Sequence, residues 1–96
     1  MDTRFVNCRF DHSKFAGGNN EYGFKRCTFE QCTFHDATWA NTYLFATTFI
    51  ACDFTDMEFR NTTIAGFKHL DCEGVDGIRF EKCEIRSIIN LRDIDP

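Results

Sequence analysis

The chain has 96 residues, 12 of them phenylalanine, and a formal net charge of −4. This length suits a single domain near the lower limit for independent folding, so we predict one domain over residues 1–96. The sequence holds no basic stripe and no apolar run long enough to cross a membrane, which argues against direct binding to nucleic acid and against insertion into a bilayer. Because no signal peptide is recognisable, we expect a cytoplasmic protein.

The first predicted repeats cover residues 3–15. Large apolar residues recur every five positions at Phe5, Phe10 and Phe15, and a smaller residue stands two positions before each one. The spacing from Phe15 to Phe24 is nine, which is one repeat plus four, so residues 16–23 contain a four-residue insertion. Glycine and asparagine in this insertion favour a projecting loop. Its candidate contact residues are Gly17, Gly18, Asn19 and Asn20.

A five-residue period then runs without a break to Ile64. The positions two before each large residue are mostly small, and the other three are mostly polar. This period matches neither a helix nor a simple strand. It predicts a chain that turns a corner every five residues, closes a four-sided coil every twenty, and stacks coils about 4.8 Å apart. The large positions are Phe24, Phe29, Phe34, Trp39, Leu44, Phe49, Phe54, Phe59 and Ile64.

Residues one coil apart should stack in columns once the insertion is set aside. Cysteines follow the same rule, since Cys8, Cys32 and Cys52 fall in one column. Stacked rings bury a large area and gain from offset packing, so the columns support the four-sided coil. Three columns are mainly aromatic and one is mixed: Phe5–Phe29–Phe49, Phe10–Phe34–Phe54, Phe15–Trp39–Phe59 and Phe24–Leu44–Ile64.

Residues 65–77 are irregular. The spacing from Ile64 to Phe80 is sixteen, so one extra residue lies within this segment. If the frame is kept, His69 and Gly74 stand at the large position, which neither fits well. If it shifts early by one, Leu70 and Val75 take that position, but Lys68 and Glu73 then point inward. The repeat resumes at residues 78–85 in either case.

The tail, residues 86–96, is apolar in part, with Ile88, Ile89, Leu91 and Ile94. A stack of repeats needs a cap over its last apolar layer, so we expect the tail to cap the open end of the coil. The same tail could instead pair two molecules as a homodimer.

Six cysteines and three histidines are the candidate metal-binding or catalytic residues. The cysteines occupy the small inward position, where a thiol acts as a small apolar filler. No CxxC occurs, and no inward histidine completes a zinc site. No histidine pairs with an evident nucleophile and carboxylate. We therefore predict no metal, no cofactor and no enzymatic activity.

Carboxylates concentrate in the middle of the chain, where residues 28–59 contain five of them and neither lysine nor arginine. We predict an acidic face made by Asp36, Asp53, Asp56 and Glu58, with one column through His12 and another through Arg9. Glu73 and Asp76 extend these columns if the extra residue follows them. Stacked like charges cost roughly 0.2–1 kcal/mol per pair. Either these corners favour aspartate, or the carboxylates serve a partner.

A second candidate surface is apolar. Tyr43, Phe45 and Ile50 project outward in two neighbouring repeats, together with Ala46 and Ala51. Ala65 and Leu70 would lie one coil further along. An exposed cluster of this kind marks an interface, unless residues 16–23 or 65–77 fold over it.

The pattern of a small residue two places before a central Phe or Leu resembles the pentapeptide-repeat family, over about residues 3–64 and again near 78–85. The resemblance implies an all-β, right-handed quadrilateral β-helix, here with about four to five coils, one inserted loop and a C-terminal cap. This chain prefers Phe over Leu at the centre. It also places Thr, Lys or Arg, rather than Asp or Asn, just before the centre.

The resemblance also implies a function. Several bacterial members are similar to DNA in width and charge and bind type II topoisomerases such as DNA gyrase, which they inhibit or protect from quinolones. The acidic face and the loop agree with such a DNA mimic. About 4.5 coils would rise roughly 22 Å, a length over which a duplex carries about 13 charges, far more than this chain. The alternative is a general protein-interaction or scaffold module that uses the apolar patch.

Overall fold

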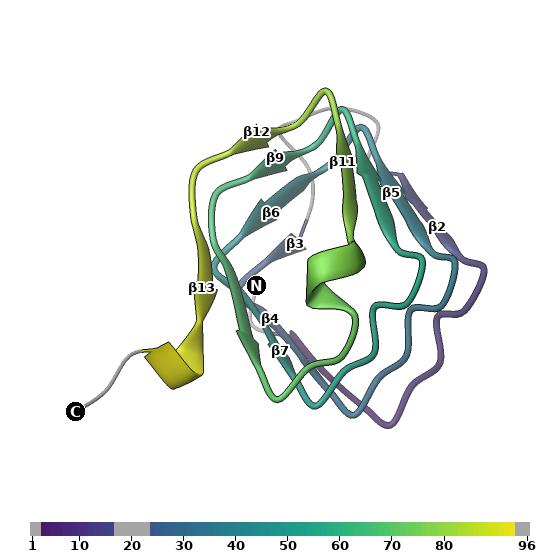
Figure 1. Ribbon diagram of the computed structural model, residues 1–96, viewed down its shortest axis with the longest axis vertical. Helices are drawn as coiled ribbons and strands as arrows, with labels where there is room; N and C mark the ends of the chain where they lie inside the picture. The colour runs from purple at the N-terminus through teal and green to yellow at the C-terminus, as the bar shows by residue number, and fades with distance from the viewer. Residues whose placement is uncertain (1–2, 17–23, 94–96) are drawn as a thin grey trace.

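The computed structural model describes residues 3–16 and 24–93, which wind into a four-sided coil of stacked turns (Figure 1). Figure 1 looks along the coil, so that successive turns overlie one another. The described residues form short strands: β1 (Thr3–Val6), β2 (Lys14–Ala16), β3 (Phe24–Lys25), β4 (Cys27–Glu30), β5 (Thr38–Ala40), β6 (Tyr43–Phe45), β7 (Thr47–Ile50), β8 (Glu58–Arg60), β9 (Thr63–Ile64), β10 (Phe67–Leu70), β11 (Arg79–Glu81), β12 (Glu84–Ile85) and β13 (Ile88–Asn90). Two 3-10 turns, η1 (Val75–Gly77) and η2 (Leu91–Asp93), complete the described elements.

Parallel pairing between successive turns builds the four sides. The first face is the sheet β1-β4-β7-β10-β13, the third is β2-β5-β8-β11, and the fourth is β3-β6-β9-β12. The second face has no regular strand; its turns are joined by single parallel bridges at Arg9, Thr33, Asp53 and Glu73. The chain is therefore a parallel β-solenoid of about four turns, and the predicted all-β fold with four sides is confirmed.

The register of the strands shows the four-residue insertion directly. Phe15 pairs with Trp39, and Phe24 pairs with Leu44. The sequence separation of the first pair exceeds that of the second pair by four residues. The first turn is thus longer than the second by this insertion, which lies between β2 and β3. The predicted loop residues Gly17, Gly18, Asn19 and Asn20 lie outside the described residues.

The extra residue of the irregular segment falls in η1. Asp53 bridges Glu73, which keeps the regular period of the coil, but Glu58 pairs with Arg79, one position beyond that period. The chain between these two pairs forms η1, so the additional residue is accommodated as a tight turn. Gly74, with φ of 77°, begins that turn.

His69 keeps the frame of the repeat, because it pairs with Phe49 across β10 and β7. The in-frame alternative is therefore correct, and the shifted one, with Lys68 and Glu73 pointing inward, is wrong. Phe67 explains why a histidine is tolerated here. Its ring is 1% exposed and stacks 4.7 Å from that of Phe49, so it continues the aromatic column from the position where other turns have a small residue.

The core is a set of stacked rings along the axis of the coil. Phe29 stacks on Phe5 at 4.8 Å and on Phe49 at 5.0 Å, with ring planes within 11° of parallel. Trp39 stacks on Phe15 at 4.1 Å and on Phe59 at 5.7 Å. Rings of neighbouring columns meet edge to face, which suits the aromatic quadrupole. The predicted aromatic columns are thus confirmed as the core.

The corners of the coil are made by residues with left-handed backbone. Each stands two positions after a central residue and has φ between 46° and 62°; they are Asn7, His12, Arg26, Gln31, Asp36, Asn41, Ala46, Ala51, Asp56, Asn61, Asp71 and Lys82. Asparagine and aspartate tolerate this conformation better than other residues do. Asp36 and Asp56 are therefore corner residues, as one of the two interpretations of the acidic column proposed.

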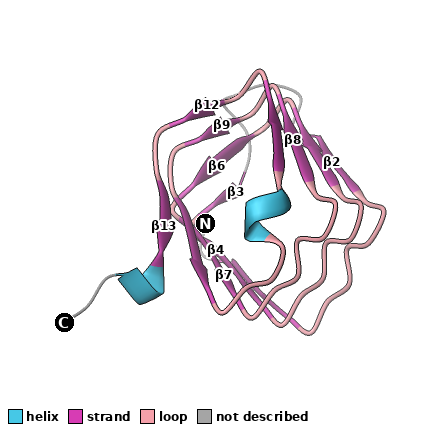
Figure 2. Ribbon diagram, viewed as in Figure 1, coloured by secondary structure: helices cyan, strands magenta, loops and turns pink. Residues whose placement is uncertain are grey.

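The C-terminal residues lengthen one side of the coil. β13 pairs with β10 as the last strand of the first face, and η2 follows it (Figure 2). Val75 of η1 packs against the core cluster, whereas Phe80, Ile85 and Ile88 of the last turn are 38–46% exposed. The described part of the tail thus extends the first face, while η1 contacts the end of the core. Within the described residues, no helix is long and apolar enough to span a membrane.

Candidate partner-binding surfaces

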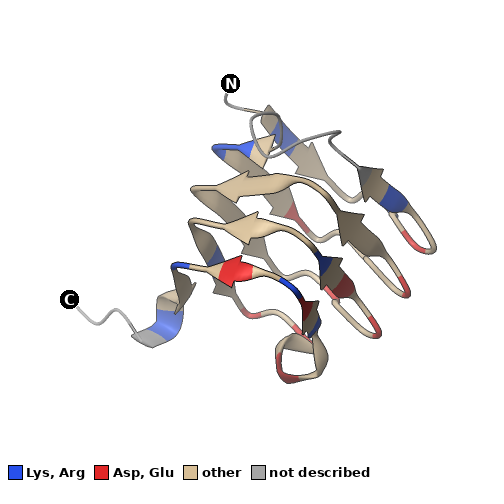
Figure 3. Cartoon of the chain, turned by 90° about the horizontal axis from the view of Figure 1, so that it is seen from above, with Lys and Arg blue, Asp and Glu red and all other residues tan. Residues whose placement is uncertain are grey.

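The second face carries the excess negative charge of the molecule. Its four turns, residues 9–12, 33–36, 53–56 and 73–76, hold six carboxylates against one cation, Arg9, a formal charge of −5 with histidine neutral. The whole chain has −4, which leaves the other residues together at +1. Figure 3 shows acidic residues at the tips of successive turns along one edge. The carboxylates are Asp11, Asp36, Asp53, Asp56, Glu73 and Asp76.

Charge on this face increases along the coil. The first turn pairs Arg9 with Asp11 and is neutral, the second has Asp36 alone, and the third and fourth turns have two carboxylates each. Glu73 extends the column of Asp53, as predicted, because the extra residue follows it. Successive turns lie about 4.8 Å apart, so Asp53 stacks with Glu73, and Asp36 stacks with Asp56. Asp76 lies in η1, where the extra residue interrupts the register.

Asp53 is held by three hydrogen bonds to Thr55 and His35. It accepts hydrogen bonds from the Thr55 hydroxyl at 2.6 Å and the Thr55 amide at 3.0 Å. His35 Nε2, from the turn below, lies 2.8 Å from its other oxygen. Burial raises the pKa of Asp53, but the bonds from Thr55 and His35 outweigh burial and leave the pKa below its ordinary value. Asp53 therefore stays ionised, and His35 offsets part of its charge when protonated.

Glu58 does not belong to this surface, and its assignment to the acidic face is corrected. It lies on β8 of the third face, where its carboxylate accepts a hydrogen bond from Arg60 Nε at 2.7 Å. Asp56 forms the corner with φ of 60°, so the chain has turned before it reaches Glu58. Asp11 joins the second face instead; its carboxylate accepts the backbone N–H of His35 at 2.9 Å.

The ion pair of His35 and Asp53 predicts a pH-dependent stability. The hydrogen bond to Asp53 raises the pKa of His35 above its ordinary 6.5, against the smaller opposing effect of burial. A raised pKa in the folded state adds stability that is fully present below 6.5 and is lost as pH rises through the folded pKa. Replacing His35 with asparagine should therefore lower the free energy of unfolding more at about pH 5 than at about pH 8. Denaturant unfolding at both pH values measures this, and equal losses would contradict the pairing.

The apolar patch lies where the fourth face meets the first. Phe45 is 39% exposed, and the Tyr43 ring stacks beside it at 6.3 Å. Ile50 lies on β7 with Leu70 opposite it on β10, which confirms the predicted neighbour in the next turn. β10 continues the coil beside β7, so it does not fold over the patch. Tyr43 and Phe45 thus lie on the fourth face, and Ile50 lies on the first face at the far end of β7, beside the next corner.

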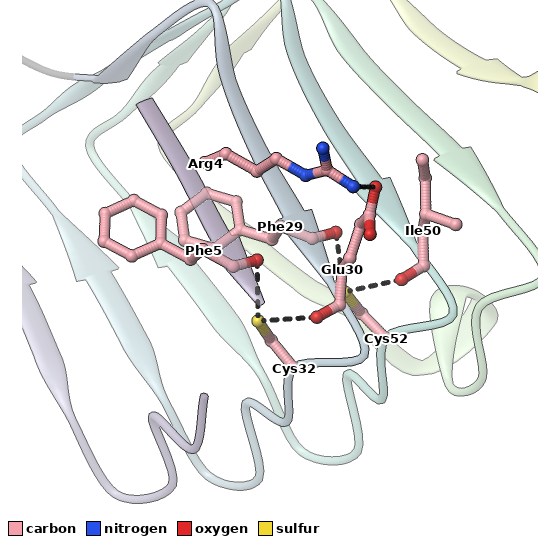
Figure 4. Close-up of polar contacts among 7 residues, drawn as sticks. All are labelled: Arg4, Phe5, Phe29, Glu30, Cys32, Ile50 and Cys52. Carbon is pink, nitrogen blue, oxygen red and sulfur yellow. Dashed lines mark hydrogen bonds and ion pairs between the residues drawn. The ribbon is translucent and has the colours of Figure 1, made fainter. Parts of the chain in front are cut away.

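None of the described cysteines forms a disulfide, and the described residues contain no cluster of three His, Cys, Asp or Glu side chains that could hold a metal ion. Cysteines instead fill the inner corners. Four of their thiols donate to one backbone carbonyl of their own turn and one of the turn below; these are Cys32, Cys52, Cys72 and Cys83. Figure 4 shows this for Cys32, which donates to Glu30 at 3.3 Å and Phe5 at 3.6 Å. The same view shows Arg4 bonded to Glu30 on the first face.

A scan against models of known protein families finds no match to this chain, and a search of curated proteins finds no significant match. The function is therefore inferred from the fold and from the two surfaces.

Proposed function

We propose that this protein is a non-catalytic binding protein whose second face presents carboxylates to the basic, DNA-binding surface of another protein. The observation that supports this most is the segregation of charge: the second face has −5 while all other residues together have +1. A surface charge so placed attracts a basic groove and speeds association with it.

The magnitudes are compatible with limited DNA mimicry. Four turns rise about 19 Å at β spacing, and a duplex of that length carries about 11 charges, of which about half face any one side. The second face, with −5, is close to that number. The match is best in the third and fourth turns, where Asp53, Asp56, Glu73 and Asp76 gather.

DNA gyrase or another type II topoisomerase is the first partner to test, because the repeat resembles the pentapeptide-repeat family. The protein would inhibit the enzyme or protect it from quinolones by occupying the site of the DNA. Another DNA-handling protein with a basic groove would meet the same surface. Pairing of two molecules through the C-terminal turn, where Phe80, Ile85 and Ile88 are exposed, would double the length of the acidic face.

The test replaces Asp36 and Asp56 with asparagine and measures inhibition of gyrase supercoiling. Asparagine at these corners preserves the backbone, since Asn41 and Asn61 adopt the same left-handed conformation at the next corner. We expect the wild type to inhibit and the double variant to need roughly thirtyfold more protein, because each of the two surface charges contributes about 1 kcal/mol at contact. Equal inhibition by both proteins, or none by the wild type at any concentration, would refute this role for the second face.

A specific observation favours a second candidate, a protein-interaction module that uses the apolar patch. Phe45 is 39% exposed with the half-buried Tyr43 ring beside it, and an exposed apolar patch can mark an interaction site. Salt separates the two candidates. Binding through the second face should weaken steeply with ionic strength, whereas binding through Phe45 and Tyr43 should not.

A further inference from the structure

Four cysteines stack in one inner column of the coil, at the corner between the first and second faces. They are Cys8, Cys32, Cys52 and Cys72, one from each turn. Each is followed directly by one of the bridged residues of the second face, so their Cα atoms are separated by about one strand spacing, roughly 4.8 Å. Disulfides join Cα atoms that are about 4.4–6.8 Å apart, so neighbours in this column are within range of one another.

A thiol is not needed at this position for packing alone. At the equivalent position elsewhere in the coil, Thr47 donates to the carbonyls of Phe24 at 3.4 Å and Phe45 at 3.3 Å. Cys72 makes the same two kinds of bond, to Phe49 at 3.3 Å and Leu70 at 3.4 Å. A hydroxyl therefore satisfies the same carbonyls, so these hydrogen bonds do not by themselves require a thiol at this position.

Cys72 differs from the thiol beneath it in its access to solvent. Cys52 is only 2% exposed, whereas Cys72 is partly exposed and lines a half-open cavity of about 400 Å³. η1 forms one wall of this cavity through Gly74 and Val75. Arg92 of η2 forms another, held there by its bond to Asp71 at 2.6 Å. Cys52 borders a neighbouring cavity of about 520 Å³, but its side chain is only 2% exposed, so a small oxidant reaches Cys72 more readily than Cys52.

We propose that Cys52 and Cys72 form a redox-active dithiol, in which Cys72 is the attacking thiol and a hydroperoxide that enters the cavity is the oxidant. The inference is independent of the partner proposed for the second face. It rests on the stacked pair, the cavity and the difference in access between the two sulfur atoms.

The reaction proceeds in two steps. The Cys72 thiolate attacks the hydroperoxide, a sulfur–oxygen bond forms, the oxygen–oxygen bond breaks, and the departing alkoxide or hydroxide takes up the proton that Cys72 had released. The Cys52 sulfur then attacks the sulfenic acid of Cys72, which forms the disulfide and releases water. Together the two thiols lose two electrons, and the hydroperoxide gains them. The products are the disulfide, one molecule of alcohol (or of water, if the oxidant is hydrogen peroxide) and one molecule of water from the second step.

Electrostatics agree with these roles. The hydrogen bond from the Cys52 thiol lowers the pKa of Cys72 to about 7, although burial opposes it. The pKa of Cys52 is raised by its contact with Cys72 and by burial, so Cys52 keeps its proton. Burial also raises the pKa of Cys32 in the turn below. Cys72 is therefore the more readily ionised thiol of the pair, and the thiolate is the reactive species.

The test oxidises the whole protein with limiting hydrogen peroxide and maps the cysteines by mass spectrometry after proteolysis. We expect a disulfide between Cys52 and Cys72 as the main product. In the Cys52→Ser variant the second step is blocked, so a sulfenic acid should accumulate at Cys72 and be trapped by dimedone. At neutral pH the rate of alkylation should be at least roughly ten times higher at Cys72 than at Cys8 or Cys32.

Cys8→Ser is the matched control, because Cys8 ends the same column at the other end of the coil but does not line this cavity. It should leave the oxidation of Cys72 unchanged, and thermal unfolding confirms that each variant folds. A disulfide between Cys8 and Cys32 formed as readily as the Cys52–Cys72 one, or equal reactivity of Cys72 and Cys8, would overturn the proposal. The wild-type map decides this even if a variant fails to fold.

Discussion

Replacing Phe49 with alanine is expected to lower the free energy of unfolding by about 3–5 kcal/mol, a large share of the stability of a small domain. The ring is fully buried and stacks between Phe29 at 5.0 Å and Phe67 at 4.7 Å. It also meets Phe54 edge to face at 5.1 Å. Backbone hydrogen bonds fix the spacing of the turns, so the coil cannot collapse into the cavity that the substitution leaves. Urea unfolding of both proteins measures the difference.

Phe45→Ala is the matched control for that substitution. It removes the same side chain from a position that is 39% exposed and outside the core, so we expect a loss below about 1 kcal/mol. If the two variants lost equal stability, the stacked rings would not be the main source of stability in this fold.

Replacing Gly66 with alanine is expected to destabilise the protein by about 1–3 kcal/mol or more. A Cβ at this position would lie 2.6 Å from the backbone nitrogen of Ala46 and 3.0 Å from its Cα. Both are backbone atoms, so no side chain can rotate away. The residue after Ala46, Thr47, donates its amide to the Gly66 carbonyl at 2.8 Å, so separating the two turns would also strain that bond. Thermal unfolding gives the shift in midpoint.

Gly77→Ala provides the comparison for Gly66. A Cβ on Gly77 would meet nothing within 4 Å, and this glycine does not have a positive φ. We expect a change within about 0.5 kcal/mol. Equal destabilisation at both glycines would mean that the contact with the Ala46 backbone is not the cause of the effect.

Much of this fold follows from a period of five. The spacing of central residues predicts the columns of rings, and the excess of four between Phe15 and Phe24 predicts the insertion that the register shows. The irregular segment was not resolved by the same rule. The rule assigns the ring to one position in five, whereas in the fourth turn Phe67 supplies the ring from the small position and His69 stands at the centre. The position of the ring in the fourth turn therefore depends on contacts between turns, which the spacing along the sequence does not show.

The acidic surface was predictable in part. Residues one full coil apart stack, so the columns of Asp36 with Asp56 and of Asp53 with Glu73 follow from spacing. Glu58 was misassigned because proximity in sequence does not keep residues on one face once a corner intervenes. The pair His35 and Asp53 was missed for a related reason. It is a diagonal contact between turns, which a rule based on residues one full coil apart does not detect.

The position of charge on the second face, rather than the net charge, is expected to determine binding. A variant with Asp36→Asn, Asp56→Asn, Asn41→Asp and Asn61→Asp moves the acidic column to the next corner and keeps the net charge of −4. All four positions have the same left-handed backbone, so the fold should be retained. Titration of gyrase supercoiling with wild type and variant is the most direct measurement. Inhibition by the wild type that weakens roughly tenfold in the rearranged variant is the predicted result. Equal inhibition by the two proteins, or none by either, would contradict the account.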